Sequence, residues 1–519
     1  MSRGRAHLMV AFEGLEVPAW LDDWLGSEPP AGVSLFREHN MRSPDQVVEL
    51  VSALQRANSS DHPLLIAVDQ EGGQLTGLVG STPFAGNMAL GAAGDTDLTR
   101  RVARAMGEEL SAVGVNLNYA PVADVASRPG NPSLGVRSFG EDPDAVAAHV
   151  SAAVQGLVGA GVLCTLKHFP GKGEAVVDPH YELPRLDLDR GRLDSVELAP
   201  FRAGISAGAD LVMTGHYAVP ALTGHDDLPV SMSRQAIDGF IRSELGFEGM
   251  VITDALDMGA LDQGAAQVVD LIASMSGGTD LLLCMPDEAL RERAGIAVER
   301  GVTRGLIPAE ALQDSARRIA AARARFRARE LDPSVVGSNL ELAEELARRS
   351  VTMVRDDAGL TPIRLESDAT LLVLEPEPTN VTPADTTALY PPGLAAAIRT
   401  HHSLVEDTVY PHDPGESDIV ALVDRARGFD LVVAATVNAT KGQADLVRGL
   451  LQTGVPVATV SLREPQDLAS YPGATTHVCT YSGHIPSLRA LASALFGETG
   501  FEGRLPVAIP GLHPIGHGG

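Results

Sequence analysis

The sequence has little cysteine and no long apolar run. Its three cysteines, Cys164, Cys284 and Cys479, lie far apart inside apolar segments and lack the spacing of metal ligands, so we expect buried free thiols. No stretch of about 18 apolar residues occurs, and the N-terminal residues lack the apolar core and small-residue cleavage site of a signal peptide. These absences predict a cytoplasmic protein without a membrane span, and they leave export by a non-classical route open.

Positive charge is also scarce. Lys and Arg number 40 against 67 Asp and Glu, which gives a formal net charge of -27. A chain this acidic repels the phosphates of nucleic acids and the anionic face of a membrane, so neither is an expected partner. Only three of the basic residues are lysines, yet Lys167 and Lys172 lie within six residues of each other.

The length of 519 residues exceeds what one hydrophobic core holds, because such cores stop growing at roughly 250–300 residues. Residues 331–339, rich in Pro, Gly, Ser and Asn, have the composition of a linker. We therefore expect one domain at residues 1–335 and a second at residues 340–519.

Short apolar runs alternate with amphipathic stretches along the first domain, at residues 7–12, 32–36, 64–69, 115–122, 162–168, 211–216, 250–255 and 280–284. Strand then helix, repeated eight times, predicts an α/β fold of the (β/α)8 TIM-like barrel type, with an open doubly wound sheet as the alternative. Four further apolar runs alternate with helical segments in the second domain, at residues 370–376, 431–437, 455–462 and 477–482. They predict a smaller α/β sandwich domain with a mostly parallel sheet.

Charged and histidine side chains follow five of the expected barrel strands, namely Asp69, Asp124, Lys167 with His168, His216 and Asp254. The carboxyl ends of barrel strands form the face on which TIM-barrel enzymes carry their active sites. Five such strand ends are more than solubility requires, so we expect the functional site there.

The loop after the fifth run contains Asp178 and His180. In an extended segment, side chains two residues apart point the same way, so the carboxylate can hold the imidazole and raise its pKa. His180 would then be a positioned proton donor near neutral pH. Together with Asp254 as a nucleophile, this pair suits cleavage of a glycosidic bond through a covalent intermediate. A solvated loop whose Asp and His never meet is the alternative.

Three other functions use the same residues. Lys167 could form a Schiff base if it is desolvated. His168, His180 and His216 with nearby acids could hold a metal, although neither an HxH nor an HExxH pattern occurs. A non-catalytic sugar-binding module is the third, whereas the GxGxxG and Walker patterns of nucleotide sites are absent.

Five segments, in order, resemble glycoside hydrolase family 3, and within it the β-N-acetylglucosaminidase branch: "VDQEGG" (68–73), "NPSLGVRSFGEDP" (131–143), "KHFPGKGE" with "DPH" (167–180), "MTGHYAVPAL" (213–222) and "FEGMVITDALDMGAL" (247–261). The ending, residues 487–518, is similar to that of the two-domain members. The resemblance therefore covers nearly the whole chain.

The resemblance implies that Asp254 is the nucleophile and that Asp178 and His180 form the general acid/base dyad. It also implies that the terminal sugar is bound by Asp69, Arg137, Lys167 and His168. We add His216 to these because it follows a strand of the expected barrel. Neither a metal nor an organic cofactor is expected. Beyond a small carbohydrate with terminal GlcNAc, no partner is predicted.

The chain departs from the usual family pattern around these residues. Lys172 and Glu174 stand where the family usually has histidine and aspartate, and Gln74 and Gly77 stand where it often has arginine. Pro179 replaces a serine and should stiffen the dyad loop. We therefore expect the catalytic residues to be retained and the entrance of the active site to differ from that of other family members.

We predict a retaining exo-β-N-acetylglucosaminidase that hydrolyses terminal β-linked GlcNAc, with muropeptide recycling as the expected pathway. A family 3 β-glucosidase is one alternative. A GlcNAc phosphorylase is another, because a neutral imidazole base does not repel phosphate. A sugar-binding protein without turnover is the alternative of another class. The second domain is expected only to support the barrel, because the five motifs all lie before residue 262.

Overall fold

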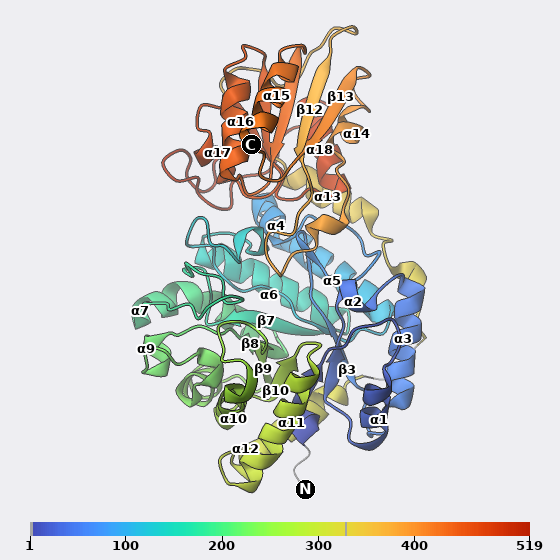
Figure 1. Cartoon of the computed structure of the whole chain (residues 1–519), viewed down its shortest axis with the longest axis vertical. Helices are drawn as coiled ribbons and strands as arrows, with labels where there is room; N and C mark the ends of the chain where they lie inside the picture. The colour runs from blue at the N-terminus through green and yellow to red at the C-terminus, as the bar shows by residue number, and fades with distance from the viewer. Residues whose placement is uncertain (1–3, 327–329, 519) are drawn as a thin grey trace.

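The computed structural model describes residues 4–326 and 330–518, which form two domains (Figure 1). In the first, eight parallel strands close into a barrel in the order β1-β2-β3-β6-β7-β8-β9-β10. Their bounds are Leu8–Val10, Gly32–Ser34, Leu65–Val68, Leu117–Asn118, Leu163–Phe169, Leu211–Thr214, Met250–Ala255 and Leu281–Cys284. Each of the eight apolar runs coincides with one of these strands, and β7 extends one residue beyond its run. The predicted barrel is confirmed, and the doubly wound alternative was wrong.

Helices surround the barrel, and several of them begin at a side chain that caps the first turn. In α3, for example, the Ser43 hydroxyl accepts the Gln46 N–H at 3.2 Å and Pro44 occupies the first turn, as is typical of a helix start. The first-domain helices are α1 Ala19–Ser27, α2 Arg37–Asn40, α3 Pro44–Ala57, α4 Asn87–Ala93, α5 Thr96–Ala112, α6 Pro143–Gly159, α7 Arg190–Arg192, α8 Ala199–Ser206, α9 Pro220–Thr223, the π-helical η5 Gln235–Glu244, α10 Gln267–Ser276, α11 Glu288–Thr303 and α12 Ala309–Arg323.

Apolar side chains fill the inside of the barrel. Met9, Leu65, Leu163, Leu211 and Ile252 are fully buried in one cluster contributed by five different strands. The interior is therefore a packed core, and a binding site has to lie at an open end of the barrel. No helix in the described ranges combines the length and the apolar character that a membrane crossing requires.

The second domain is built on a six-stranded sheet in the order β11-β16-β15-β14-β12-β13, parallel except for β11 against β16. The strands are β11 Thr352–Asp356, β12 Leu371–Pro376, β13 Val405–Tyr410, β14 Leu431–Thr436, β15 Val457–Ser461 and β16 Thr476–Cys479, and the helices are α13 Leu340–Ser350, α14 Leu394–Ile398, α15 Glu416–Ala426, α16 Lys441–Leu451, α17 Asp467–Ser470 and α18 Ile485–Leu495. The mostly parallel sheet is confirmed. The outer strands β11 and β13 were not predicted, because β13 is an edge strand that exposes Glu406 and Asp407 and so has no apolar run.

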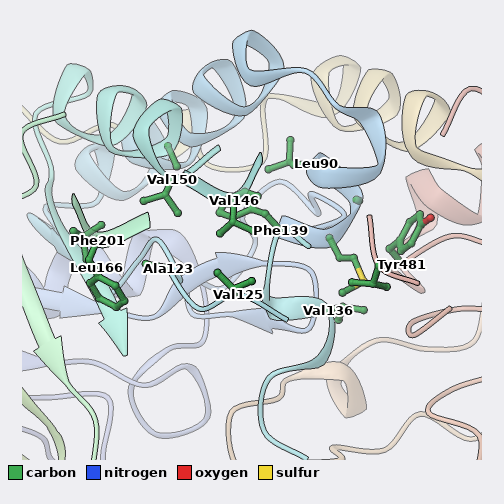
Figure 2. Packing of buried hydrophobic residues seen from close by; sticks show 14 of the residues in the cluster. Leu90, Ala123, Val125, Val136, Phe139, Val146, Val150, Leu166, Phe201 and Tyr481 are labelled. Atoms are coloured by element: carbon green, nitrogen blue, oxygen red, sulfur yellow. The ribbon is translucent and has the colours of Figure 1, made fainter. Parts of the chain in front are cut away.

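One hydrophobic cluster continues from the barrel helices into the second domain. Figure 2 shows Val146 and Val150 of α6 in this cluster together with Phe139 and, from the second domain, Tyr481. The segments after β12 and β16 meet Gly73 and Gln74 of the barrel around a cavity of about 50 Å³. The carboxyl edge of the second sheet therefore faces the barrel. The expected boundary between residues 335 and 340 remains a prediction.

Candidate active site

Strand ends of the barrel bring the expected polar residues around one cavity. Asp69 follows β3, Lys167 and His168 end β7, and Asp254 lies in β9, and all four line a cavity of about 600 Å³. Arg137 reaches the same cavity from the loop between β6 and α6. Ligand pockets usually measure roughly 300–1,000 Å³, so this cavity is large enough for a small-molecule substrate.

Two buried cations and two carboxylates form a fixed cluster on the cavity wall. The Lys167 ammonium donates to Asp69 and also pairs with Glu71, both at 2.6 Å. The Arg137 guanidinium donates to both oxygens of Glu71, at 2.8 and 2.9 Å. Burial would raise the pKa of Glu71, but Arg137 and Lys167 outweigh it and lower this pKa to about 2. Glu71 therefore stays ionised at neutral pH and fixes Arg137 and Lys167, which line the cavity with Asp69 and present preorganised groups suited to sugar hydroxyls.

His168 is held by a carboxylate behind it. Its Nδ1 lies 2.8 Å from Asp124, which also accepts the main-chain N–H groups of His168 and Lys172. Burial and the neighbouring cations, Lys172 foremost, lower the pKa of His168 well below its usual value. The ring is therefore neutral, its Nδ1–H donates to Asp124, and its Nε2 is left as an acceptor.

The expected dyad is formed. One oxygen of Asp178 accepts both the main-chain N–H of His180 at 3.0 Å and its ring Nδ1–H at 2.6 Å. Burial would raise the pKa of Asp178, but these bonds from His180 and the nearby positive charge hold it below its usual value. His180 lines the cavity, and with Nδ1 bonded to Asp178 its Nε2 is free to exchange a proton. The solvated-loop alternative, in which these two side chains never meet, was wrong.

The loop after Asp254 holds the dyad loop by its main chain. The N–H of Gly259 donates to the His180 carbonyl at 2.9 Å, and the N–H of Ala260 donates to the Pro179 carbonyl at 3.1 Å. A Cβ on Gly259 would lie 2.6 Å from the Tyr181 carbonyl oxygen, so only glycine fits there. The segment that carries the expected nucleophile thus also fixes the expected proton donor.

Asp254 keeps one oxygen available. Its Oδ1 accepts the main-chain N–H of Ala255 at 2.8 Å, and its Oδ2 has no hydrogen-bond partner among the described residues. His216 takes a different place from the one expected: it is fully buried, its ring nitrogens contact Ser231 at 2.8 Å and the Ala255 carbonyl at 3.1 Å, and it does not line the cavity among the described residues. The structure therefore places His216 behind the lining of the cavity, where the ring supports the main chain beside Asp254.

Lys172 places a second, isolated ammonium in the cavity. The side chain is 2% exposed and lines the cavity, and within the described ranges its ammonium makes neither an ion pair nor a hydrogen bond. Burial, reinforced by Arg137, lowers the pKa of Lys172 to about 8. Glu174, the other departure in this motif, pairs with Arg192 at 2.8 Å away from the cavity.

The second domain contributes a wall of the cavity, contrary to the expectation that it only supports the barrel. A loop after β12 lines the cavity through Asn380, Thr382, Pro383, Ala384, Asp385 and Thr386. Figure 1 shows this domain seated on the barrel with a loop descending toward it. The sequence of this loop is typical of a polar surface loop, so no local pattern predicts that the loop lines the cavity.

Glu71 and Asp124 hold cavity residues from behind, Glu71 through Arg137 and Lys167 and Asp124 through His168, and no role for either was predicted from the sequence. Glu71 lies within the "VDQEGG" motif, and Asp124 is one of the polar residues that follow the five strands. The place of each in the sequence could therefore have indicated that it lies near the site. The alternatives based on other chemistry find no geometric support. Lys167 is paired with two carboxylates, and no three His, Cys, Asp or Glu side chains in residues 4–326 and 330–518 gather in a way that could hold a metal ion.

Comparisons with known proteins identify the family of this chain. The sequence profile of the "Glycosyl hydrolase family 3 N terminal domain" matches residues 19–322. "Beta-hexosaminidase A" of Pseudoalteromonas piscicida is 31% identical over 567 residues, covering 95% of this chain and 91% of that protein. "Beta-hexosaminidase" of Xylella fastidiosa (strain M23) is 37% identical over 309 residues, covering 58% of this chain and 90% of that protein. A solved glycoside hydrolase family 3 β-N-acetylglucosaminidase from Paenibacillus sp. str. FPU-7 superimposes with a TM-score of 0.92 at 33% identity, covering 98% of both chains. The chain belongs to glycosyl hydrolase family 3.

Proposed function

We propose that this protein is a retaining exo-β-N-acetylglucosaminidase that removes terminal β-linked GlcNAc through a covalent glycosyl-enzyme. β-N-Acetylhexosaminidase activity is supported by the family membership and by the relatives just described. The observation that carries the finer proposal is that Asp254 and His180 line one cavity, while Asp178 holds the far nitrogen of the His180 ring.

In the first step, the free carboxylate oxygen of Asp254 attacks the anomeric carbon. His180 gives the proton on Nε2 to the glycosidic oxygen, the bond to the leaving group breaks, and an ester joins the sugar to Asp254. Asp178 stabilises the imidazolium before transfer and fixes the ring tautomer after it. Asp69, Arg137, Lys167 and His168, which line the cavity, hold the hydroxyls of the terminal sugar.

In the second step, neutral His180 takes a proton from water, and the resulting nucleophile attacks the anomeric carbon and releases Asp254. Two displacements restore the β configuration. As the pathway we propose muropeptide recycling in the cytoplasm, on the resemblance of the five motifs to the β-N-acetylglucosaminidase branch.

A mechanism-based fluorosugar of GlcNAc configuration tests this proposal. We expect mass spectrometry to find the adduct on the peptide that contains Asp254, and Asp254→Asn to lower kcat on 4-nitrophenyl β-GlcNAc about 10⁴-fold or more. Asp262→Asn is the matched control, because Asp262 is exposed and lies outside the cavity lining. Full activity of Asp254→Asn, or an adduct on another residue, would overturn the assignment.

The same assay separates the alternatives. Faster turnover of 4-nitrophenyl β-glucoside than of the GlcNAc substrate would indicate a β-glucosidase. Tight sugar binding with neither turnover nor adduct would indicate a binding protein.

Phosphorolysis is a second candidate, favoured by the isolated ammonium of Lys172 in the cavity. A cation in this cavity opposes the positive charge that develops on the anomeric carbon in the transition state, and an anionic acceptor would offset that repulsion. Phosphate in place of water would supply that anion. Release of GlcNAc 1-phosphate in phosphate buffer would identify a phosphorylase, and release of free GlcNAc without it at saturating phosphate would identify a hydrolase.

A further inference from the structure

The loop Asn380–Thr386 is held rigidly against the barrel. The side-chain amide of Gln74 donates to the Ala384 carbonyl at 3.0 Å, and the Gln74 carbonyl accepts the N–H of Thr386 at 2.8 Å. Arg463 pairs with the buried Asp385 at 2.7 Å and also contacts the Gln74 side chain. Gln74, where the family often has arginine, is therefore the barrel's anchor for a loop of the other domain.

This loop presents a fixed hydrogen-bond donor. The Oδ1 of Asn380 accepts the main-chain N–H of Ala388 at 2.9 Å, which orients the amide. Its Nδ2 has no partner among the described residues, and Asn380 lines the cavity. The Asp385 carboxylate is already used, since it accepts the N–H groups of Val381 and Thr387 besides pairing with Arg463.

An aromatic ring lines the same cavity. Tyr181 directly follows His180 and is 73% exposed, which is unusual for so large an apolar surface. An exposed ring and an oriented amide donor that line one cavity suit a pyranose, because sugar rings offer an apolar face and a rim of hydroxyls.

We propose that Asn380 and Tyr181 bind a saccharide leaving group, so that the second domain takes part in choosing the substrate. This inference rests on the proposed function. The residues expected to hold the terminal sugar all come from the barrel, whereas Asn380 lies on a loop that the barrel does not encode. Relatives such as that of Xylella fastidiosa match 58% of this chain over 90% of their own length, and so have no room for a second domain of this size.

The two-step reaction gives this role a distinct kinetic signature. The leaving group departs in the first step, so a residue that touches only the leaving group alters kcat/KM without altering hydrolysis of the glycosyl-enzyme. A glycosyl fluoride has no leaving-group ring and forms the same glycosyl-enzyme. The kcat/KM for the glycosyl fluoride therefore depends on the terminal sugar and the catalytic residues, and not on a contact with a leaving-group sugar.

The variant Asn380→Asp keeps the acceptor for Ala388 and removes the N–H donors. We expect its kcat/KM for N,N′-diacetylchitobiose to fall about tenfold, and its kcat/KM for β-N-acetylglucosaminyl fluoride to change less than about twofold. Tyr181→Ala should show the same pattern. Thr379→Val, in the same loop but outside the cavity lining, is the matched control and should leave both values unchanged.

Equal losses on both substrates, or no loss on either, would overturn the inference while leaving the proposed function intact. If the unaltered protein turns over neither substrate, the proposed function itself fails. The two failures are thus distinguishable.

Discussion

Lys172 carries a buried charge whose cost depends on pH. Its pKa falls from 10.5 to about 8 on folding, so below about pH 8 the folded state bears the full cost of the charge, roughly 3 kcal/mol. Between these two values the unfolded chain binds the proton and the folded chain does not. The free energy of unfolding therefore rises with pH between about 8 and 10.5, and above about pH 10.5 the Lys172 charge no longer destabilises the folded state.

We expect Lys172→Met to raise the free energy of unfolding at pH 7, with a gain that shrinks toward pH 10.5. Denaturant titrations at several pH values measure it. Lys441→Met is the control, because Lys441 is 88% exposed and should show a small difference at every pH. A gain for Lys172→Met that is independent of pH would contradict the assignment of the cost to its charge.

Single residues were predictable from the sequence where neighbours in the chain interact. Asp178 and His180 are two residues apart, so their contact follows from local geometry. The role of Glu71 does not, because its partner Arg137 lies 66 residues away and only the closed barrel brings the two together.

Among the elements, the loop after β9 acts as a dock for the dyad loop. Its two main-chain bonds to Pro179 and His180 leave no space for a side chain at Gly259. A methyl group there has to displace the His180 main chain, and with it the proton donor.

We expect Gly259→Ala to lower kcat/KM about 100-fold for substrates with poor leaving groups, which need a proton, and only a few-fold for 2,4-dinitrophenyl β-GlcNAc, which does not. A series of aryl substrates of graded leaving-group pKa measures this. Gly26→Ala in α1 is the control, since no atom lies within 4 Å of its added Cβ. The same loss across the whole series would show a general disturbance instead of a displaced acid.

Strands were predictable where they are buried on both faces, as all eight barrel strands are. The edge strand β13 escaped prediction because its middle residues are exposed and polar, so its place in the sheet depends on pairing with β12 rather than on an apolar run.

For the whole molecule, the join between the domains is part of the cavity. Arg463 is 4% exposed and paired with Asp385, which is 2% exposed, and it also contacts Gln74 of the barrel. Removing one partner of a buried ion pair leaves the other charge uncompensated, which costs about 3–5 kcal/mol.

We therefore expect Arg463→Met to lower the free energy of unfolding by about that amount and to lower kcat/KM for N,N′-diacetylchitobiose, because the cavity loop loses its anchor. Arg489→Met is the control, since Arg489 and Glu344 form an exposed pair at 3.6 Å. Calorimetry and steady-state kinetics check both effects. Unchanged stability and activity in Arg463→Met would refute the anchoring role.

The number of domains was predictable from length and composition, but the cavity lined by residues of both domains was not. The contacts that build it connect Gln74 to Ala384 and Arg463, over 310 and 389 residues of sequence. No local pattern records contacts over such distances.

The scarcity of lysine has a practical outcome for handling the protein. Lys167 and Lys172 are each 2% exposed inside the cavity, whereas Lys441 stands out at the start of α16. Lys441 is therefore the exposed lysine that an amine-reactive reagent can modify, besides the α-amino group. Coupling to an activated resin or a dye at Lys441 would attach the molecule through its second domain, with the α-amino group as the competing site.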